Sequence, residues 1–359
     1  MSAEVSLQGL TKVFRSRGEE VVAVDHLDLS VNAGELVTLL GPSGCGKTTT
    51  LRLVGGFEIP DGGRVYIGGR DVTDLPPQKR DTATVFQSYG LFPHMTVFEN
   101  VAFGLKLRRL SRREIHRRVS EALRLVNLEG LERRYPRELS GGQQQRVALC
   151  RALVVEPEVL LFDEPLSNLD AKLRIETREQ IRRIQREVGI TSIYVTHDQA
   201  EAMAISDRVA VMNAGRIQQL GDPYEIYAHP ANRFVADFIG RANFLEAEVL
   251  EATDGTFRVR LSPGVILEVP AVEGLSPGER AVAVIRPEAM DILPPGEGDI
   301  DARVIFAHYT GSLATYRLEL PNGETVEAEV LSPREHGFLS EGAEVGIRFH
   351  RQSIHLLRE

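Results

Sequence analysis

Short apolar runs alternate with amphipathic stretches over the first 220 or so residues of the chain. Four runs are predicted strands: ELVTLL (35–40), TATVFQ (82–87), VLLFDE (159–164) and TSIYVTH (191–197). The last two are almost wholly apolar, as strands covered on both faces of a sheet are. Strands that alternate with helical segments are typical of βαβ units, so we expect an α/β domain built on a parallel sheet.

Two longer stretches have helical periodicity. From Asp170 to Gly189 apolar side chains recur every three or four residues, which predicts a helix with an apolar face of Leu173, Thr177, Ile181, Ile184 and Val188. The interval between Phe92 and Glu156 is rich in arginine and mostly helical in pattern. We interpret it as a helical subdomain of about residues 88–157 inserted into the sheet domain.

The pattern changes near residue 240. From Arg241 onward, short alternating strands such as TFRVRL, ATYRLEL and TVEAEV are separated by DG, SPG, PPG and PNG turns. This predicts an α/β domain over residues 1–240 and an all-β domain over residues 241–359, most simply a small barrel. Residues 275–293 and 339–357 align without gaps, which suggests two similar half-units.

Composition narrows the class of protein. The 359 residues are 42% hydrophobic and 26% charged, which is typical of a soluble globular protein. No apolar run approaches the ~18 residues that span a bilayer, and the start MSAEVSLQGL predicts no secretory signal. Only Cys45 and Cys150 could pair, which favours a reducing cytosol over a disulfide framework. The net charge of −9 gives no broad basic face, so we expect no nucleic-acid partner.

A phosphate-binding loop stands between the first predicted strand and a helix. GPSGCGKT at 41–48 has the form G-x-x-x-x-G-K-[ST], in which glycines let backbone N–H groups surround phosphate oxygens. Lys47 can reach the β- and γ-phosphates, and the Thr48 hydroxyl can ligate Mg²⁺. The alternative, a glycine-rich turn without a ligand, is disfavoured because strand, loop, Lys-Thr and helix occur together.

Polar side chains end three of the predicted strands. Asp163 and Glu164 close VLLFDE, His197 closes TSIYVTH, and Gln87 closes TATVFQ. At the carboxyl edge of a parallel sheet they would lie beside the phosphate loop. Asp163 would then hold Mg²⁺ and Glu164 would act as general base, with His197 near the γ-phosphate and Gln87 near Mg²⁺ or the attacking water. Alone, each has an ordinary alternative, such as a solvated acidic turn or a structural histidine.

A second glycine pair, in LSGGQQQR at 139–146, carries no lysine. Together with the phosphate loop, Gln87, LLFDEP, SNLD (167–170) and His197, in this order, it resembles the ATP-binding subunits of ATP-binding-cassette (ABC) transporters, over about residues 4–240. The C-terminal β region resembles the OB-like regulatory domain of the importer branch that serves maltose, polyamines, ferric iron and sulfate. The resemblance therefore implies a P-loop NTPase fold of the ABC ATPase type followed by that domain.

The resemblance also implies roles for residues at matching positions. Phe14 would stack on adenine, with core packing as the alternative. Ser140, Gly141, Gly142 and Gln143 would contact the γ-phosphate held by a second subunit, and Asp170 would reach across the dimer. The implied catalytic residues are Glu164, His197 and Gln87, and the implied Mg²⁺ ligands are Thr48, Gln87 and Asp163. The implied ATP-binding residues are Phe14, Gly41, Pro42, Ser43, Gly44, Cys45, Gly46, Lys47, Thr48, Thr49, Ser140, Gly141, Gly142, Gln143 and Asp170. Because thiols at helix N-termini ionise readily, we expect a lowered pKa at Cys45.

The function implied is an ATPase that powers import of a small solute. Two copies would form a homodimer around two MgATP and would contact two membrane permease subunits near residues 87–96, at the cytoplasmic face of the inner membrane. An extracytoplasmic binding protein would deliver the solute. Polyamines or ferric iron are the first expectation, and a sugar of the maltose type or sulfate is the alternative.

Two other functions compete with this expectation. A soluble ABC ATPase of DNA repair or translation is disfavoured because only one cassette occurs and the interval from Gln87 to Ser140 is too short for a coiled coil. Exporters are disfavoured because their ATPase is usually fused to a membrane domain, which this sequence does not show. A regulatory role for the β region, binding a solute or a protein, is compatible with import.

Overall fold

The computed structural model describes residues 2–16, 19–333 and 337–358. Its compact units are Met1–Pro223 and Tyr224–Glu359, whereas the sequence predicts the division after residue 240. The difference concerns two short helices, α7 (Pro223–Ala228) and α8 (Arg233–Phe238).

These helices group with the β-rich unit because one buried arginine holds them there. The Arg286 guanidinium donates hydrogen bonds to the carbonyls of Tyr227, Ala236 and Arg241. Ala236 also packs against Val284 and other apolar side chains of the β-rich unit. The polar and apolar contacts therefore both tie the helices to the strands that follow them.

A six-stranded sheet forms the centre of the first unit, in the order β10-β9-β3-β8-β7-β6. All of its neighbouring strands are parallel except β10, which pairs antiparallel with β9. The bounds are β3 Leu36–Leu40, β6 Thr82–Val85, β7 Val159–Asp163, β8 Thr191–Thr196, β9 Arg208–Asn213 and β10 Arg216–Gly221. The four predicted strands and the parallel sheet are confirmed.

A second, antiparallel sheet is formed by strands on both sides of β3 in the chain, and the sequence analysis does not predict it. Its order is β2-β1-β4-β5, with β1 Val5–Ser16, β2 Glu19–Val31, β4 Gly62–Ile67 and β5 Arg70–Asp71. Apolar side chains of this sheet share one core cluster with α1 (Lys47–Gly55) and with Val37 and Leu39 of β3. Helix α1 is therefore packed against apolar side chains of the antiparallel sheet as well as those of β3.

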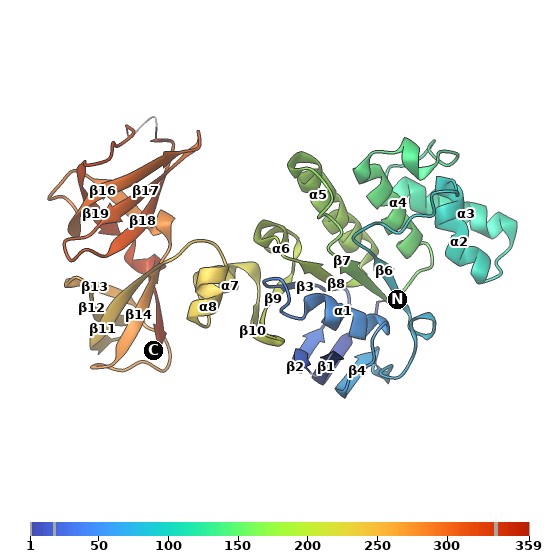
Figure 1. Ribbon diagram of the computed structural model, residues 1–359, viewed down its shortest axis with the longest axis horizontal. Coiled ribbons are helices and arrows are strands. Elements are labelled where there is room, and N and C mark those ends of the chain that lie inside the picture. Colours follow the sequence, from blue (N-terminus) through green and yellow to red (C-terminus); the bar gives the residue numbers. More distant parts are fainter. Residues whose placement is uncertain (1, 17–18, 334–336, 359) are drawn as a thin grey trace. The chain divides into compact units, whose positions relative to one another are not determined.

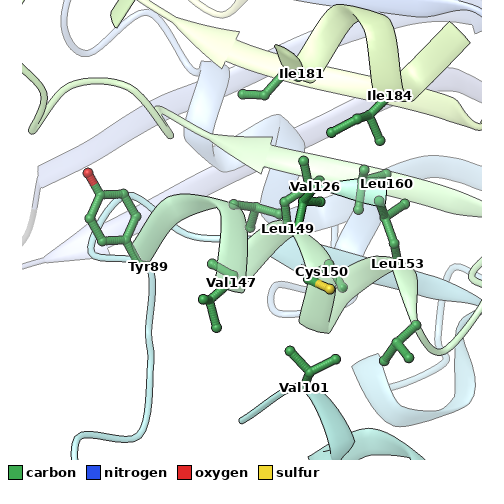
Figure 2. Close-up of a cluster of buried hydrophobic side chains, with 14 of the residues drawn as sticks. Tyr89, Val101, Val126, Val147, Leu149, Cys150, Leu153, Leu160, Ile181 and Ile184 are labelled. Carbon is green, nitrogen blue, oxygen red and sulfur yellow. The ribbon is translucent and has the colours of Figure 1, made fainter. Parts of the chain in front are cut away.

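The expected helical subdomain is present beside the edge strand β6 (Figure 1). Its helices are α2 Val97–Leu107, α3 Arg112–Leu125 and α4 Gly141–Leu153. Figure 2 shows Val101, Val126 and Val147 packed near Cys150, in a core that continues to Leu160 of the sheet. No helix of the described residues is both long enough and apolar enough to cross a membrane.

Helix α5 (Ala171–Val188) follows β7, and α6 (Gln199–Ile205) follows β8. Thr177, Ile181 and Ile184 on α5 are buried as expected, but Val188 is 47% exposed. Val188 is the last residue of the helix, which ends at Gly189 in the left-handed conformation, so the predicted apolar face stops one turn early.

The second unit is all β apart from its two leading helices, as expected. Its two five-stranded antiparallel sheets have the orders β13-β12-β11-β14-β20 and β15-β19-β16-β17-β18. The bounds are β11 Asn243–Thr253, β12 Thr256–Leu261, β13 Val265–Pro270, β14 Arg280–Ile285, β15 Met290–Leu293, β16 Ile300–Tyr309, β17 Leu313–Glu319, β18 Thr325–Leu331, β19 Glu344–Phe349 and β20 His355–Arg358.

The sequence repeat in this unit corresponds to a structural repeat. Each copy is a strand, one 3₁₀ turn and a second strand: β14, Pro287–Ala289 and β15 in the first, and β19, Arg351–Ser353 and β20 in the second. The copies exchange pairings, since β14 pairs with β20 and β15 pairs with β19. The two half-units thus contribute one strand each to both sheets.

Arg80 closes the end of α1 and gives a test of what holds this helix in place. It is 5% exposed and donates to four carbonyls, those of Leu53, Val54, Thr73 and Leu75. We predict that Arg80→Leu lowers the free energy of unfolding of the first unit by about 3 kcal/mol, because buried acceptors lose a charged donor. Urea unfolding followed by circular dichroism measures the loss.

Arg64→Leu is the matched control, since Arg64 is exposed and its partner is a single surface carboxylate, that of Asp71. It should leave the free energy of unfolding nearly unchanged, because water screens an exposed ion pair. Equal losses in the two variants would contradict the role assigned to Arg80.

Candidate nucleotide site

The phosphate loop leads from β3 into α1, and its glycines are required by close backbone contacts. A Cβ at Gly41 would lie 2.3 Å from the Met212 carbonyl oxygen, and one at Gly46 would lie 2.2 Å from that of Ala23. Gly46 is the N-cap of α1 in the left-handed conformation, and no side chain caps the helix. The first N–H groups of α1 are therefore free to bind an anion.

Lys47 lies within this loop. Its side chain is buried, and the ammonium group donates to the carbonyls of Gly41 at 2.7 Å and Pro42 at 2.9 Å. Ser43 and Gly44 are exposed at the outside of the loop. The Lys47 ammonium group and the N–H donors at the start of α1 therefore lie close together in the same loop. A di- or triphosphate requires this combination of positive charge and N–H donors.

The Cys45 expectation is wrong. Cys45 is 3% exposed, and burial raises the pKa of its thiol in spite of the nearby Lys47 charge, whose ammonium lies 3.8 Å from the sulfur. The sequence correctly places the thiol at a helix N-terminus but gives no sign that its side chain points into the core. Desolvation of the thiolate outweighs the helix and the lysine.

Thr48 and Asp163 meet where α1 begins and β7 ends. The Thr48 hydroxyl donates to the Asp163 carboxylate at 3.4 Å, and Thr49 is half-buried beside it on α1. Burial raises the pKa of Asp163, while the Arg52 charge and the Thr48 hydrogen bond oppose that effect. Among the described residues Asp163 has no ion-pair partner, so a half-buried carboxylate next to a hydroxyl fits a Mg²⁺ ion, which favours oxygen ligands.

Glu164 and His197 are brought together at the same sheet edge. The His197 Nδ1 atom lies 3.0 Å from the Glu164 carboxylate, although 33 residues separate them in sequence. Glu164 adopts a left-handed backbone conformation with φ of 43°, and its N–H donates to the carbonyl of Val195 on β8. Two neighbouring parallel strands thus deliver an acid and an imidazole to one point, as the sequence predicts.

Gln87 and Phe14 are not brought into this group by any interaction of the described residues. The Gln87 side chain is exposed two residues beyond β6, and its backbone carbonyl accepts a hydrogen bond from Asn168 at 2.9 Å. Phe14 lies on β1 with 40% of its surface exposed, and Lys12 lies 5.5 Å from its ring centroid. Their roles toward Mg²⁺ and adenine remain predictions.

The second glycine pair opens helix α4. Ser140 is the N-cap and forms a reciprocal pair with Gln143: its hydroxyl accepts from the Gln143 N–H, and the Gln143 side chain accepts from the Ser140 N–H. A Cβ at Gly142 would lie 2.8 Å from Leu173 of α5. Glycine at this position therefore lets α5 approach closely. Ser140 itself is exposed, at the positive end of the α4 dipole.

Asp170 ends the SNLD loop and caps α5. Its carboxylate accepts a hydrogen bond from the Leu173 N–H at 2.9 Å, and the residue is exposed. The reach across a dimer that the resemblance implies for Asp170 is not represented in a single chain and remains a prediction.

Sequence reasoning missed the side chains that connect these loops. Arg151 of α4 donates to the carbonyls of Tyr89 and Gly90, just after Gln87. Asn168 in the SNLD loop holds the Gln87 carbonyl, and Arg174 on the first turns of α5 reaches Asp198 beside His197. Their only sequence signal is position: Asn168 lies inside SNLD, and Arg151 and Arg174 lie five and four residues beyond a recognised motif.

Comparison with known proteins identifies the family. Residues 24–167 match the family model described as ABC transporter, and residues 283–357 match the TOBE domain. A spermidine/putrescine import ATP-binding protein of Rubrobacter xylanophilus is 51% identical over 346 residues, covering 96% of this chain and 90% of the relative. The chain belongs to the ATP-binding subunits of ABC transporters.

Other relatives of this ABC subunit agree. An Fe(3+) ions import ATP-binding protein of Brucella abortus is 46% identical over 355 residues, covering 99% of this chain and 98% of the relative. Among solved structures, the dimeric ATP-binding cassette MJ0796 in a post-hydrolysis state with ADP and Pi matches with a TM-score of 0.55 and 32% identity, over 61% of this chain and 98% of that chain. The predicted family, fold class and importer-type ATPase activity are confirmed.

The raised pKa of Cys45 predicts low thiol reactivity. In a Cys150→Ala variant, Cys45 should react with iodoacetamide at pH 8 severalfold more slowly in the folded protein than in the chain unfolded in urea, because burial disfavours the thiolate. Mass spectrometry over a time course measures both rates. Reaction in the folded protein as fast as in urea would contradict this prediction and support the helix-terminus effect.

Proposed function

We propose that this ABC subunit binds MgATP between two copies of the chain and uses its hydrolysis to drive the import of a small cationic solute. The observation that carries the proposal is the start of α4, where the exposed N-cap Ser140 precedes a lysine-free glycine pair whose N–H groups can bind an anion away from the phosphate loop of their own chain. The dimeric MJ0796 cassette supports the view that α4 faces a nucleotide held by the phosphate loop of a second copy.

Within one chain, the phosphate loop supplies binding. The N–H groups at the start of α1 and the Lys47 ammonium would hold the β- and γ-phosphates, and the exposed Phe14 ring would lie against adenine. Thr48 and Asp163 would hold Mg²⁺, with Gln87 as a further ligand. When bound, the ion neutralises phosphate charge, which lowers the barrier to attack by a nucleophile.

Glu164 and His197 supply the chemistry of hydrolysis. The Glu164 carboxylate would accept a proton from water as the water oxygen bonds to the γ-phosphorus and the bond to the ADP oxygen breaks. The proton then passes to the released phosphate, so that Glu164 returns to its charged form. His197, already bonded to Glu164 in the structure, would orient the carboxylate and donate to the γ-phosphate.

The second copy would complete the site. Ser140 and the N–H groups of Gly141 and Gly142 would donate to the γ-phosphate held by the other chain, with Gln143 and Asp170 beside them. ATP would stabilise the closed pair by mass action, since nucleotide would bind the pair better than the single chain. Closure would move the segment 87–96 against two permease subunits at the cytoplasmic face of the inner membrane.

The solute is proposed from relatives only. Spermidine or putrescine is the first candidate and Fe³⁺ the second, because relatives at 51% and 46% identity are import ATP-binding proteins for these solutes. A strain lacking this gene, complemented with the wild-type chain or with Lys47→Ala, separates the candidates. Loss of labelled spermidine uptake, restored only by the wild-type chain, supports a polyamine, whereas selective loss of iron uptake supports the second candidate.

Glu164→Gln tests the general base. We predict that turnover falls by a factor of about 10² or more, because no group of matching basicity remains beside His197. ATP binding should persist, so the variant should form an ATP-loaded dimer that is visible by light scattering.

Glu158→Gln makes the same chemical change one residue before the opposite end of β7 and should leave turnover unchanged. Normal hydrolysis by Glu164→Gln would exclude Glu164 as the base.

A further inference from the structure

Arg174 joins the loop that follows Glu164 to the turn that contains His197, and these two residues are the candidate catalytic pair. Its Nη1 lies 3.2 Å from the Asp198 carboxylate, directly after His197, and its Nη2 donates to the Leu169 carbonyl at 3.2 Å. Both bonds come from one planar guanidinium, which holds its donors in a fixed fork. The separation between Leu169 and Asp198 is thus set by a rigid group.

Apart from the contact of His197 with Glu164, the other interactions of the His197 turn come from its own segment. The Asp198 N–H donates to the Thr196 hydroxyl, which in turn donates to the buried Glu201 carboxylate. Asp198 also caps α6 by accepting from the Glu201 N–H. Among the described residues, Arg174 supplies the one side-chain contact to Asp198 from outside β8 and α6.

The other end of the Arg174 bridge is the loop that starts at Glu164. Ser167 donates to the Glu164 carbonyl through its hydroxyl at 3.0 Å and through its N–H at 3.3 Å, so the loop is tight at its start. Leu169 is buried at its end, next to the glycine pair of α4. A displacement of the glycine pair or of Leu169 would therefore reach Arg174 before it reaches His197.

We propose that Arg174 is a positioning residue that sets the contact between His197 and Glu164 by holding Asp198 at a fixed distance from Leu169. The proposal rests on the proposed function of His197 and Glu164. It also makes the bridge a route by which a second copy, docking on the glycine pair, changes the geometry of the general base. The Arg174 Nε atom is buried with no partner among the described residues, so the guanidinium is not fully satisfied in this arrangement.

The test compares three variants on the full chain. Arg174→Ala should lower kcat for ATP by about 10- to 100-fold with KM within twofold, because misplacement by about 1 Å is costly to chemistry while the nucleotide-binding groups are untouched. Arg174→Lys keeps the charge but not the fork and should recover part of the loss. Asp198→Asn keeps a good helix cap and removes the charge, so it isolates the ion pair.

Arg178→Ala is the matched control. Arg178 lies one turn further along α5 and donates to the Ala200 carbonyl on α6, without contacting Asp198. It should leave kcat and KM unchanged within twofold. An equal fall in kcat for Arg178→Ala would overturn the proposal, since the effect would then belong to general packing of α5 on α6.

A double-mutant cycle decides whether Arg174 acts through Asp198. If it does, Arg174→Ala combined with Asp198→Asn is no slower than Arg174→Ala alone, whereas multiplied losses overturn the proposal. The ring ¹⁵N signals of His197, assigned with His197→Asn, should shift in Arg174→Ala as in Glu164→Gln and stay in place in Arg178→Ala. An unshifted signal in Arg174→Ala overturns the proposal.

The two hypotheses fail in different ways. Normal hydrolysis by Glu164→Gln refutes the proposed base and with it the role of the bridge. An inactive Glu164→Gln together with a fully active Arg174→Ala leaves the proposed function standing and refutes the bridge alone.

Discussion

The free N–H groups at the start of α1 are the constraint on which the rest of the first unit depends. A helix that begins at Gly46 without a side-chain cap has strong donors that only an anion or water can satisfy. The carbonyl groups of Met212 and Ala23 lie so close to Gly41 and Gly46 that neither position can carry a side chain, and the N–H groups stay accessible. The parallel sheet then determines what faces it, because β7 and β8 end at the same edge and present Asp163, Glu164 and His197 there.

The start of α4 differs from the start of α1 in a way that defines its role. Ser140 and Gln143 satisfy each other's N–H groups there, which leaves the N–H groups of Gly141 and Gly142, and this helix start has no lysine. An anion bound there would be held weakly unless it were anchored elsewhere. The glycines serve a second purpose as well, because they allow Leu169 and Leu173 to pack against the helix start. The start of α4 and the end of the SNLD loop are therefore in direct contact.

Motifs carried by backbone geometry could be predicted from the sequence. The phosphate loop, the strands that end in Asp163 and His197, and the repeat in the β-rich unit all have local signatures of glycine spacing or alternation. Long-range side-chain contacts could not be predicted. Three arginines make such contacts: Arg286 holds α7 and α8 to the β-rich unit, Arg80 closes α1, and Arg174 joins two loops. Each has at least one partner far away in sequence, and arginine is too common in this chain for any one of them to stand out. The direction of the Cys45 pKa shift could not be predicted either, because a position at a helix N-terminus does not show which way a loop side chain points.

The proposed contact of Ser140 with the nucleotide of another chain is tested most directly by an experiment that separates ATP binding from dimer formation. In a Glu164→Gln background, Ser140→Arg should bind a fluorescent ATP analogue with unchanged affinity as a monomer, yet remain monomeric by light scattering at ATP concentrations that dimerise Glu164→Gln alone. Ser111→Arg, which replaces the N-cap serine of α3, controls for loss of a helix cap and should still dimerise. Loss of ATP binding by the Ser140→Arg monomer, or normal ATP-dependent dimerisation of that variant, would contradict the composite site.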